Sequence, residues 1–193
     1  YVAQKGILPE IYSYGHRNPQ GLFYDPKRGL LFSNEHGPKG GDEINIIKPK
    51  LNYGWPEITY GIDYTGFEIT PHQTKAGMET PLVNWTPSIA PSSMLVYQGK
   101  AFPALNGLLL NTALKFREIR VVKLTNQQVS STSNAKTLIE NKSNNSHSGY
   151  SLVEQKTLLK QLNERLRDIA IDDDGLIYVI TDSGKLLQLR PAD

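Results

Sequence analysis

The residues with the clearest chemical potential lie in one short stretch, Asn34 to Asn45, with the sequence NEHGPKGGDEIN. Its acidic pair, Asp42 and Glu43, supplies carboxylates, and its Gly-Pro step leaves carbonyl oxygens without an amide hydrogen at the proline. Oxygen ligands of these kinds are the ones that calcium prefers. The stretch therefore predicts a calcium-binding loop. The same glycines and acids also fit an ordinary β-turn between two strands.

A second set of side chains could bind an anion. Arg17 and Asn18 come just before an apolar segment. Arg165 and Arg167 come before another, and alternation along an extended chain sends both to the same side. With Lys115 they form a candidate receptor for a polyanionic ligand, because guanidinium groups bind carboxylates bidentately. The alternative is a solvated strand edge whose arginines pair with Asp or Glu.

The hydrophobic pattern predicts a scaffold of short β-strands for these side chains. An apolar strand, a turn, a strand that begins with Gly and two apolar residues, and a third strand recur over 21–47, 93–124 and 168–189. Such repeats favour an all-β fold of the β-propeller type, with a β-sandwich as the alternative. Closed propellers have about 4 to 8 blades, so three units correspond to roughly half of one. An isolated half would expose a sheet edge, and we expect it to associate or to be unstable.

Three segments interrupt this pattern within the expected single domain, residues 1–193. Residues 50–91 are aromatic and rich in Gly and Pro, which predicts ordered loops on one face. Residues 130–149 are too polar to pack and predict a mobile loop. The apolar spacing in 153–166 is compatible with a short helix or an irregular connection.

The composition excludes several classes of protein. The chain has 193 residues, a net charge of +2 with scattered lysines and arginines, and no cysteine. The lack of a basic stripe argues against nucleic-acid binding, and the lack of cysteine excludes disulfides and thiolate metal sites. No apolar run approaches the roughly 20 residues that span a bilayer. The sequence starts without Met or a signal peptide, so a fragment of a longer protein is expected.

Taken in order, the motifs point to one family. The chain resembles the C-terminal half of the soluble PQQ-dependent aldose sugar dehydrogenases, the glucose or sorbosone dehydrogenase type. The matching segments are residues 15–22, 35–45, 52–56, 85–92, 113–115, 164–169 and 176–182. The resemblance covers the chain apart from the polar segment 130–149. It implies a six-bladed β-propeller, of which this chain would form about three blades.

The resemblance implies PQQ and Ca²⁺ as cofactors. Arg17 and Asn18 would contact PQQ, with Arg17 near its reactive carbonyls, and Tyr64 would lie beside it. The carboxylates of PQQ would be neutralised by Lys115, Arg165 and Arg167.

The resemblance also implies metal and substrate contacts. Gly37 and Pro38 would give main-chain oxygens to the calcium that holds the cofactor. Glu43 and Tyr53 would bind a second, structural calcium. Trp85 would form an apolar wall of the sugar site.

By resemblance, the protein would oxidise aldoses at C1 to lactones by hydride transfer to the quinone, and would pass electrons to an external acceptor. The implied location is the periplasm or the exterior, without a membrane span, and a homodimer is one expected assembly. The general base in this family is a histidine upstream of the Arg17-Asn18 motif, so this chain alone is expected to be inactive. His16 is the alternative base. His36, His72 and His147 lie in other contexts.

Two further hypotheses belong to other classes. The chain could be a noncatalytic propeller that serves as a binding module, although such relatives usually lose the cofactor residues that are retained here. It could also be a calcium-stabilised structural unit without a ligand.

Overall fold

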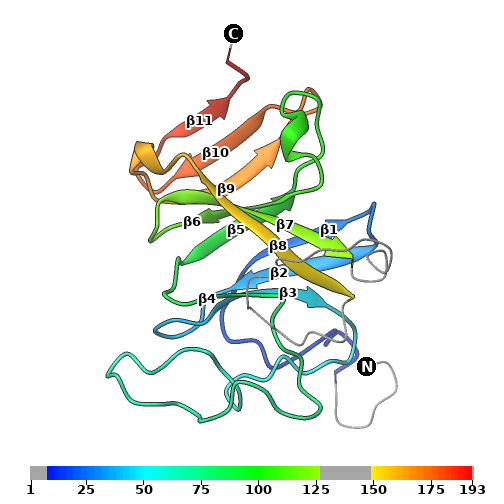
Figure 1. Cartoon of the computed structure of the whole chain (residues 1–193), viewed down its shortest axis with the longest axis vertical. Coiled ribbons are helices and arrows are strands. Elements are labelled where there is room, and N and C mark those ends of the chain that lie inside the picture. The colour runs from blue at the N-terminus through cyan, green and yellow to red at the C-terminus, as the bar shows by residue number, and fades with distance from the viewer. Residues whose placement is uncertain (1–7, 127–148, 193) are drawn as a thin grey trace, which may run out of the picture.

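The computed structural model describes residues 8–126 and 149–192, which form three antiparallel β-sheets with almost no helix (Figure 1). The first sheet holds, in spatial order, β1 (Pro19–Asp25), β2 (Leu30–Glu35), β3 (Asp42–Ile47) and β4 (Val83–Trp85). The second holds β5 (Pro91–Val96), β6 (Leu109–Ala113), β7 (Glu118–Asn126) and β8 (Tyr150–Leu158). The third holds β9 (Leu166–Ile171), β10 (Ile177–Thr181) and β11 (Leu186–Leu189). Two short 3₁₀ turns are η1 (Pro103–Leu105) and η3 (Lys160–Leu162).

The three predicted strand units correspond to the three sheets, each built from consecutive strands. The segments between these units follow the prediction less closely. Residues 50–82 are ordered loops, as predicted, and the same segment then contributes β4. The predicted loop over 130–149 lies outside the described residues apart from Gly149.

The expectation of a short helix or irregular connection over 153–166 is wrong for its first part. Residues up to Leu158 belong to β8, and only residues 160–162 turn as a 3₁₀ helix. β8 is largely exposed and carries few apolar residues, so no apolar pattern marks it. Its conformation is set by the backbone ladder to β7, which pairs Ile119 with Leu158 and Asn126 with Tyr150 at its ends.

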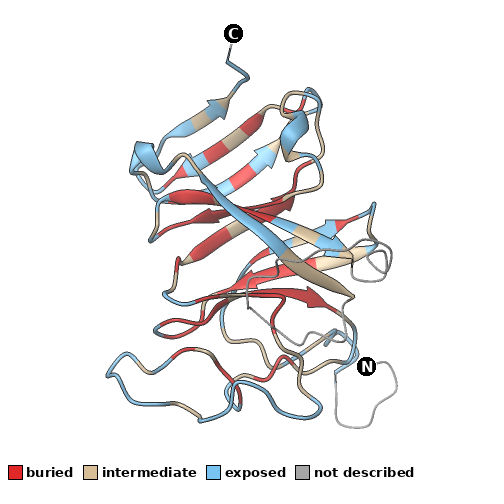
Figure 2. Ribbon diagram, in the orientation of Figure 1, coloured by how far each residue is buried: buried red, intermediate tan, exposed pale blue. Residues whose placement is uncertain are grey.

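The core consists of two apolar layers, one on each face of the second sheet (Figure 2). Met94 and Val96 of β5 pack toward the first sheet, and Leu95 and Tyr97 pack toward the third. This is the alternation expected of an extended strand that is buried on both faces. Three sheets stacked in series favour the propeller-like interpretation over a two-sheet sandwich.

The strands of all three sheets end on a common side of the molecule, which we call the site edge. The loops at this side carry most of the predicted site residues. The site edge is formed by residues 15–18, 36–41, 86–90, 114–117, 159–165 and 182–185 and lies at the left in Figure 1, where the short yellow-orange turn is η3. Two contacts join neighbouring sheets here. His36 Nε2 lies 2.6 Å from Pro91 O, and Ser92 Oγ donates to Leu166 O at 2.7 Å.

The opposite edge is fastened in the same way. Arg28 Nη2 donates to Gly107 O at 2.7 Å, and Tyr97 Oη donates to Gly175 O at 2.7 Å. At both edges, a side chain of one sheet meets a main-chain oxygen of the next.

Removal of the Tyr97 hydroxyl should destabilise the protein. Tyr97 is fully buried, and its oxygen also accepts a hydrogen bond from Phe102 N at 3.0 Å. In the full-length protein, Tyr97→Phe should lower the free energy of unfolding in urea by about 1–3 kcal/mol, because two buried polar groups lose their partner. Tyr24→Phe, whose residue is 58% exposed, is the control and should change it by less than about 0.5 kcal/mol. Equal effects of the two substitutions would contradict this account.

Candidate functional site

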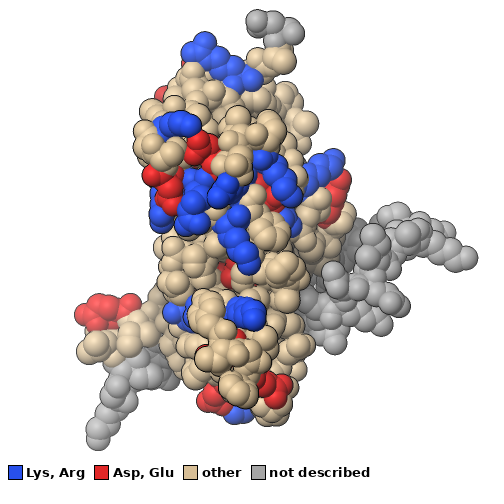
Figure 3. Space-filling view, turned by 90° about the vertical axis from the view of Figure 1, so that its left-hand side faces the viewer, with Lys and Arg blue, Asp and Glu red and all other residues tan. Residues whose placement is uncertain are grey.

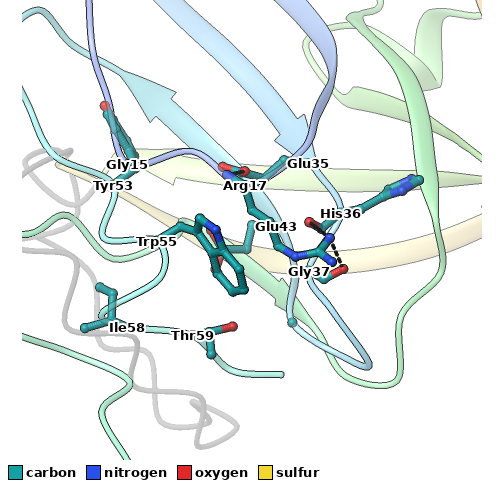
Figure 4. A pocket seen from close by; sticks show the side chains of 11 residues that line it. Gly15, Arg17, Glu35, His36, Gly37, Glu43, Tyr53, Trp55, Ile58 and Thr59 are labelled. Atoms are coloured by element: carbon teal, nitrogen blue, oxygen red, sulfur yellow. Dashed lines mark hydrogen bonds between the residues drawn. The ribbon is translucent and has the colours of Figure 1, made fainter. Parts of the chain in front are cut away.

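Arg17 is held in place from several sides just before β1 (Figure 4). Its Nη1 donates to His36 O at 3.1 Å and to Gly37 O at 2.8 Å. Its guanidinium carbon lies 5.2 Å from the centroid of the Trp55 ring, a cation–π contact. Its Nε is buried and has no hydrogen-bond partner among the described residues. The side chain is therefore a fixed cation with an unused donor.

A row of polar residues crosses the first sheet beside Arg17. Glu35 of β2 stands opposite Glu43 of β3, which stands opposite Asn84 of β4. Like charges directly opposite one another destabilise a sheet. Glu35 is well compensated, since it accepts hydrogen bonds from Arg17 N at 2.7 Å and Asn45 Nδ2 at 3.1 Å.

Glu43 is compensated less well. It accepts a hydrogen bond from Asn45 Nδ2 at 3.1 Å. Burial, and then the charge of Glu35, raise the pKa of Glu43 to about 8. A cation beside Glu43 would stabilise its ionised carboxylate, because it would offset both the burial and the Glu35 charge that raise the pKa.

Asp42 is used in another way. Its carboxylate accepts hydrogen bonds from Gly37 N at 3.0 Å, Ser88 Oγ at 2.9 Å and Ala90 N at 2.7 Å. It therefore fastens the 36–41 loop to the start of the second sheet. The sequence had suggested Asp42 as a calcium oxygen together with Glu43, and the structure gives it this structural role instead.

The glycine at position 37 is required by the tightness of this loop. A Cβ there would lie 2.3 Å from both Gly40 O and Gly41 O. The packing leaves the main chain of Gly37 in direct reach of Arg17. In residues 8–126 and 149–192, no group of three or more His, Asp or Glu side chains is placed so that it could hold a metal.

A pocket brings part of the predicted set together. It is lined by Gly15, Arg17, Glu35, His36, Gly37, Gly41, Glu43, Tyr53, Trp55, Ile58 and Thr59 (Figure 4). Of the residues that the sequence singled out, it thus contains Arg17, Gly37, Glu43 and Tyr53. The Tyr53 hydroxyl is already used in a hydrogen bond, because it donates to Ile46 O at 2.7 Å. Burial raises the pKa of Tyr53 to about 12.

His16 is wedged beside this pocket. Its ring stacks on Tyr53 with centroids 4.6 Å apart. Nε2 lies 2.8 Å from Ser13 Oγ, and Nδ1 lies 3.3 Å from Glu35 Oε1. Both ring nitrogens therefore have partners, and the geometry favours a packing role over that of a general base.

Arg165, just before β9, and Arg167 of β9 point to the same side, as alternation predicts. Arg165 Nε donates to Asp182 Oδ2 at 2.7 Å, and Arg167 Nε donates to Asp182 Oδ1 at 2.8 Å. Hydrogen bonds from both arginines lower the pKa of Asp182. This pairing agrees with the alternative of a paired strand edge, but one carboxylate cannot neutralise two guanidinium groups. Lys115 is exposed on the 114–117 loop of the same edge.

Three further predicted residues lie elsewhere. Trp85 is 4% exposed in the core, and its Nε1 donates to Gln155 Oε1 at 2.7 Å, so its ring is not an open wall in this chain. Tyr64 is 69% exposed on a turn next to Ile62, which pairs with Lys39 through two backbone hydrogen bonds. The Asn18 side chain accepts a hydrogen bond from Gln20, and Pro38 is buried. Ligand contacts of these residues stay predictions.

Sequence reasoning missed two functional-site residues. Trp55 and Glu35 both lie within segments that match the family, but their residue types and spacing alone predict no role for them. The position of Trp55 beside Arg17 depends on how the 48–82 loop folds back, which short motifs do not encode. The pairing of Glu35 with Glu43 could have been found by aligning β2 and β3 around the 36–41 loop.

The chain is similar over nearly its whole length to known proteins. The model of the glucose/sorbosone dehydrogenase family matches residues 1–188. This chain belongs to that family. It is 36% identical over 195 residues to the aldose sugar dehydrogenase YliI of Escherichia coli (strain K12), covering 99% of this chain and 46% of that protein.

Solved structures support the same assignment. The soluble aldose sugar dehydrogenase from Escherichia coli, in its apo-form, matches with a TM-score of 0.81 at 35% identity, over 99% of this chain and 50% of that one. The PQQ-bound aldose sugar dehydrogenase from Streptomyces coelicolor matches with a TM-score of 0.59 at 25% identity, over 93% of this chain and 45% of that one. The chain thus spans about half the length of the relatives it matches.

The raised pKa of Glu43 gives the metal-free protein a testable pH dependence. Unfolded Glu43 loses its proton near 4.5, while the folded protein keeps it until about pH 8. Its contribution to stability is therefore fully present below 4.5 and is lost as pH rises to about 8. Thermal melts of the full-length protein in chelator should show Tm falling over this window, and Glu43→Gln should flatten the fall. Glu68→Gln, on an exposed loop residue, is the control. An identical pH slope in wild type and Glu43→Gln would refute the assignment.

Proposed function

We propose that this chain forms the part of a PQQ- and calcium-dependent aldose dehydrogenase that holds most of the cofactor. The observation that carries the proposal is the fixed guanidinium of Arg17 beside the poorly compensated carboxylate of Glu43. By strand order and register, both lie at the same edge as Lys115, Arg165 and Arg167. Membership of a sugar dehydrogenase family and the likeness to a PQQ-bound relative support it.

The residues at the site edge suit a polycarboxylate. Arg165 and Arg167 share one carboxylate, and Lys115 forms no salt bridge within the described part of the chain. These cations would hold the carboxylates of PQQ, with Asn18 and Tyr64 as further neighbours. Bound PQQ would supply the quinone that accepts hydride from C1 of an aldose, which becomes a lactone. The unused Nε of Arg17 would donate a hydrogen bond to a quinone oxygen.

The donor set around Arg17 also suits calcium. The Gly37 and Pro38 carbonyls would bind the calcium that holds and polarises the cofactor. Glu43 and Tyr53 would bind a second calcium that stabilises the fold. At both sites the chain would supply carbonyl or carboxylate oxygens, and a bound cation would lower the free energy of the folded protein.

In our proposal, this chain forms only part of the sugar site and does not supply the general base. Both nitrogens of His16 are engaged, and His36 Nε2 contacts Pro91 O. As the resemblance to the family implies, the general base would come from the remainder of the full-length protein, as would completion of the propeller ring to six blades. Any contact of Trp85 with the sugar would need access from that side.

Location and assembly are also part of the proposal. In the described residues, no helix has the length and apolarity to cross a membrane. We expect a periplasmic or secreted protein that passes electrons to an external acceptor. A homodimer remains a prediction.

The activity can be tested with dye reduction by the full-length protein, reconstituted with PQQ, over a panel of aldoses. Turnover should require calcium and stop in chelator, and the present chain alone should be inactive. Arg17→Gln should lower kcat by about 10²-fold or more, as loss of an electrostatic donor does. Activity of the isolated chain would refute the missing base. Absence of PQQ uptake by the full-length protein would favour a noncatalytic binding module.

The double substitution Arg165→Gln/Arg167→Gln tests the cofactor contacts separately from folding. It should weaken PQQ binding about 10²-fold or more, since charge-assisted bonds to carboxylate are lost, while circular dichroism and Tm change little. Arg190→Gln, on an exposed residue after β11, is the matched control. Unchanged PQQ affinity in a folded double variant would leave only the structural role of the Asp182 pairs.

A further inference from the structure

The site edge carries more positive charge than the proposed cofactor contacts need. Beyond Arg17, Lys115, Arg165 and Arg167, which are assigned to PQQ, Arg117 and Lys160 are among the exposed cations there. Figure 3, which faces this edge, shows Lys and Arg side chains gathered over its upper half. We call Arg117 and Lys160 the cationic rim.

The charges of the cationic rim are only partly balanced by nearby carboxylates. Arg117 forms no salt bridge within the described residues, and its Nη1 donates to the neutral Asn163 Oδ1 at 2.7 Å. A hydrogen bond from Lys185 and, to a smaller extent, the charge of Arg117 lower the pKa of Glu164, but the carboxylate of Glu164 is already paired with Lys185. Lys160 Nζ lies 3.8 Å from Glu118 Oε2. Glu118, however, already accepts a hydrogen bond from Arg120 Nε at 2.7 Å through its other oxygen. One buried carboxylate thus serves two cations, and the rim keeps a surplus of positive charge.

The backbone around the rim is fixed in an unusual form. Arg117, Leu159 and Asn163 have φ of 55°, 64° and 54°, in the left-handed region that non-glycine residues seldom occupy. Lys160 Nζ also lies 5.9 Å from the centroid of the Phe116 ring. Such strain often marks functional surfaces, and held side chains lose less entropy when a partner docks.

The rim lies beside the proposed cofactor site and outward from it. In the second sheet, β5 packs against β1 and β9, while β7 and β8 are the strands further out. Arg117 precedes β7 and Lys160 follows β8. Both cations are therefore surface neighbours of Lys115, and Lys160 is 66% exposed rather than set in a cavity.

Resting on the proposed function, we propose that the cationic rim docks the acidic face of an electron-transfer protein that reoxidises the cofactor. Oxidation of one sugar to a lactone releases two electrons and two protons. Two one-electron carriers would each take one electron, and the protons would pass to solvent. The carrier must approach the site edge to receive electrons, and surplus positive charge there attracts a negatively charged surface.

The test uses the full-length, PQQ-loaded protein at saturating aldose, with plastocyanin as an acidic carrier and mitochondrial cytochrome c as a basic one. At about 10 mM ionic strength, where the Debye length is about 30 Å, Arg117→Gln/Lys160→Gln should lower kcat/KM for plastocyanin about three- to tenfold. Salt should erase the difference. The value for cytochrome c should stay the same or rise. Lys27→Gln/Lys100→Gln removes two exposed charges at the opposite edge and should have little effect.

Neutral benzoquinone separates docking from catalysis. Its kcat/KM, the KM for aldose and the affinity for PQQ should be the same in wild type and in the rim variant. An equal loss in both double variants, or an equal loss with benzoquinone, would overturn the docking surface while leaving the dehydrogenase intact. Lack of turnover with every acceptor would instead refute the proposed function, and the docking surface with it.

Discussion

The burial of a single carboxylate, that of Asp42, sets the geometry on which the site depends. It satisfies the amide of Gly37 on one side and the amide of Ala90 on the other. The 36–41 loop is thereby held against the start of the second sheet, with its carbonyls turned toward Arg17. A buried charge is retained only where it is fully hydrogen-bonded, and here that requirement also orients the cation of the site.

Three neighbouring carboxylates illustrate how surroundings assign roles to like groups. Asp42 is fully committed to backbone and hydroxyl donors, and Glu35 is shared between the main chain of Arg17 and the amide of Asn45. Glu43 has fewer donors and retains its proton into the neutral range. The protonation of Glu43 thus differs from that expected of an exposed glutamate because of burial first and of the neighbouring Glu35 charge second, while hydrogen-bond donors hold Asp42 and Glu35 in place.

Sequence reasoning succeeded where the outcome depends on local periodicity. The strand units and the common side of Arg165 and Arg167 follow from alternation alone. It failed where long-range contacts decide. β8 is an exposed, polar strand whose only signal is its ladder with β7. Burial of Trp85 and full use of Asp42 depend on which sheet packs beside the first, and a motif read along the chain does not contain that information.

The joints between sheets have a consequence for how this fold can diversify. His36, Ser92, Arg28 and Tyr97 each reach across to a main-chain oxygen of the neighbouring sheet. The receiving sheet contributes only its backbone, which every amino acid provides. Each of these four joints therefore constrains the sequence on one side alone. Side-chain pairs such as Trp85 with Gln155 and Asn34 with Asn111 constrain both sheets at once, so neighbouring sheets can diversify independently only at positions outside such pairs.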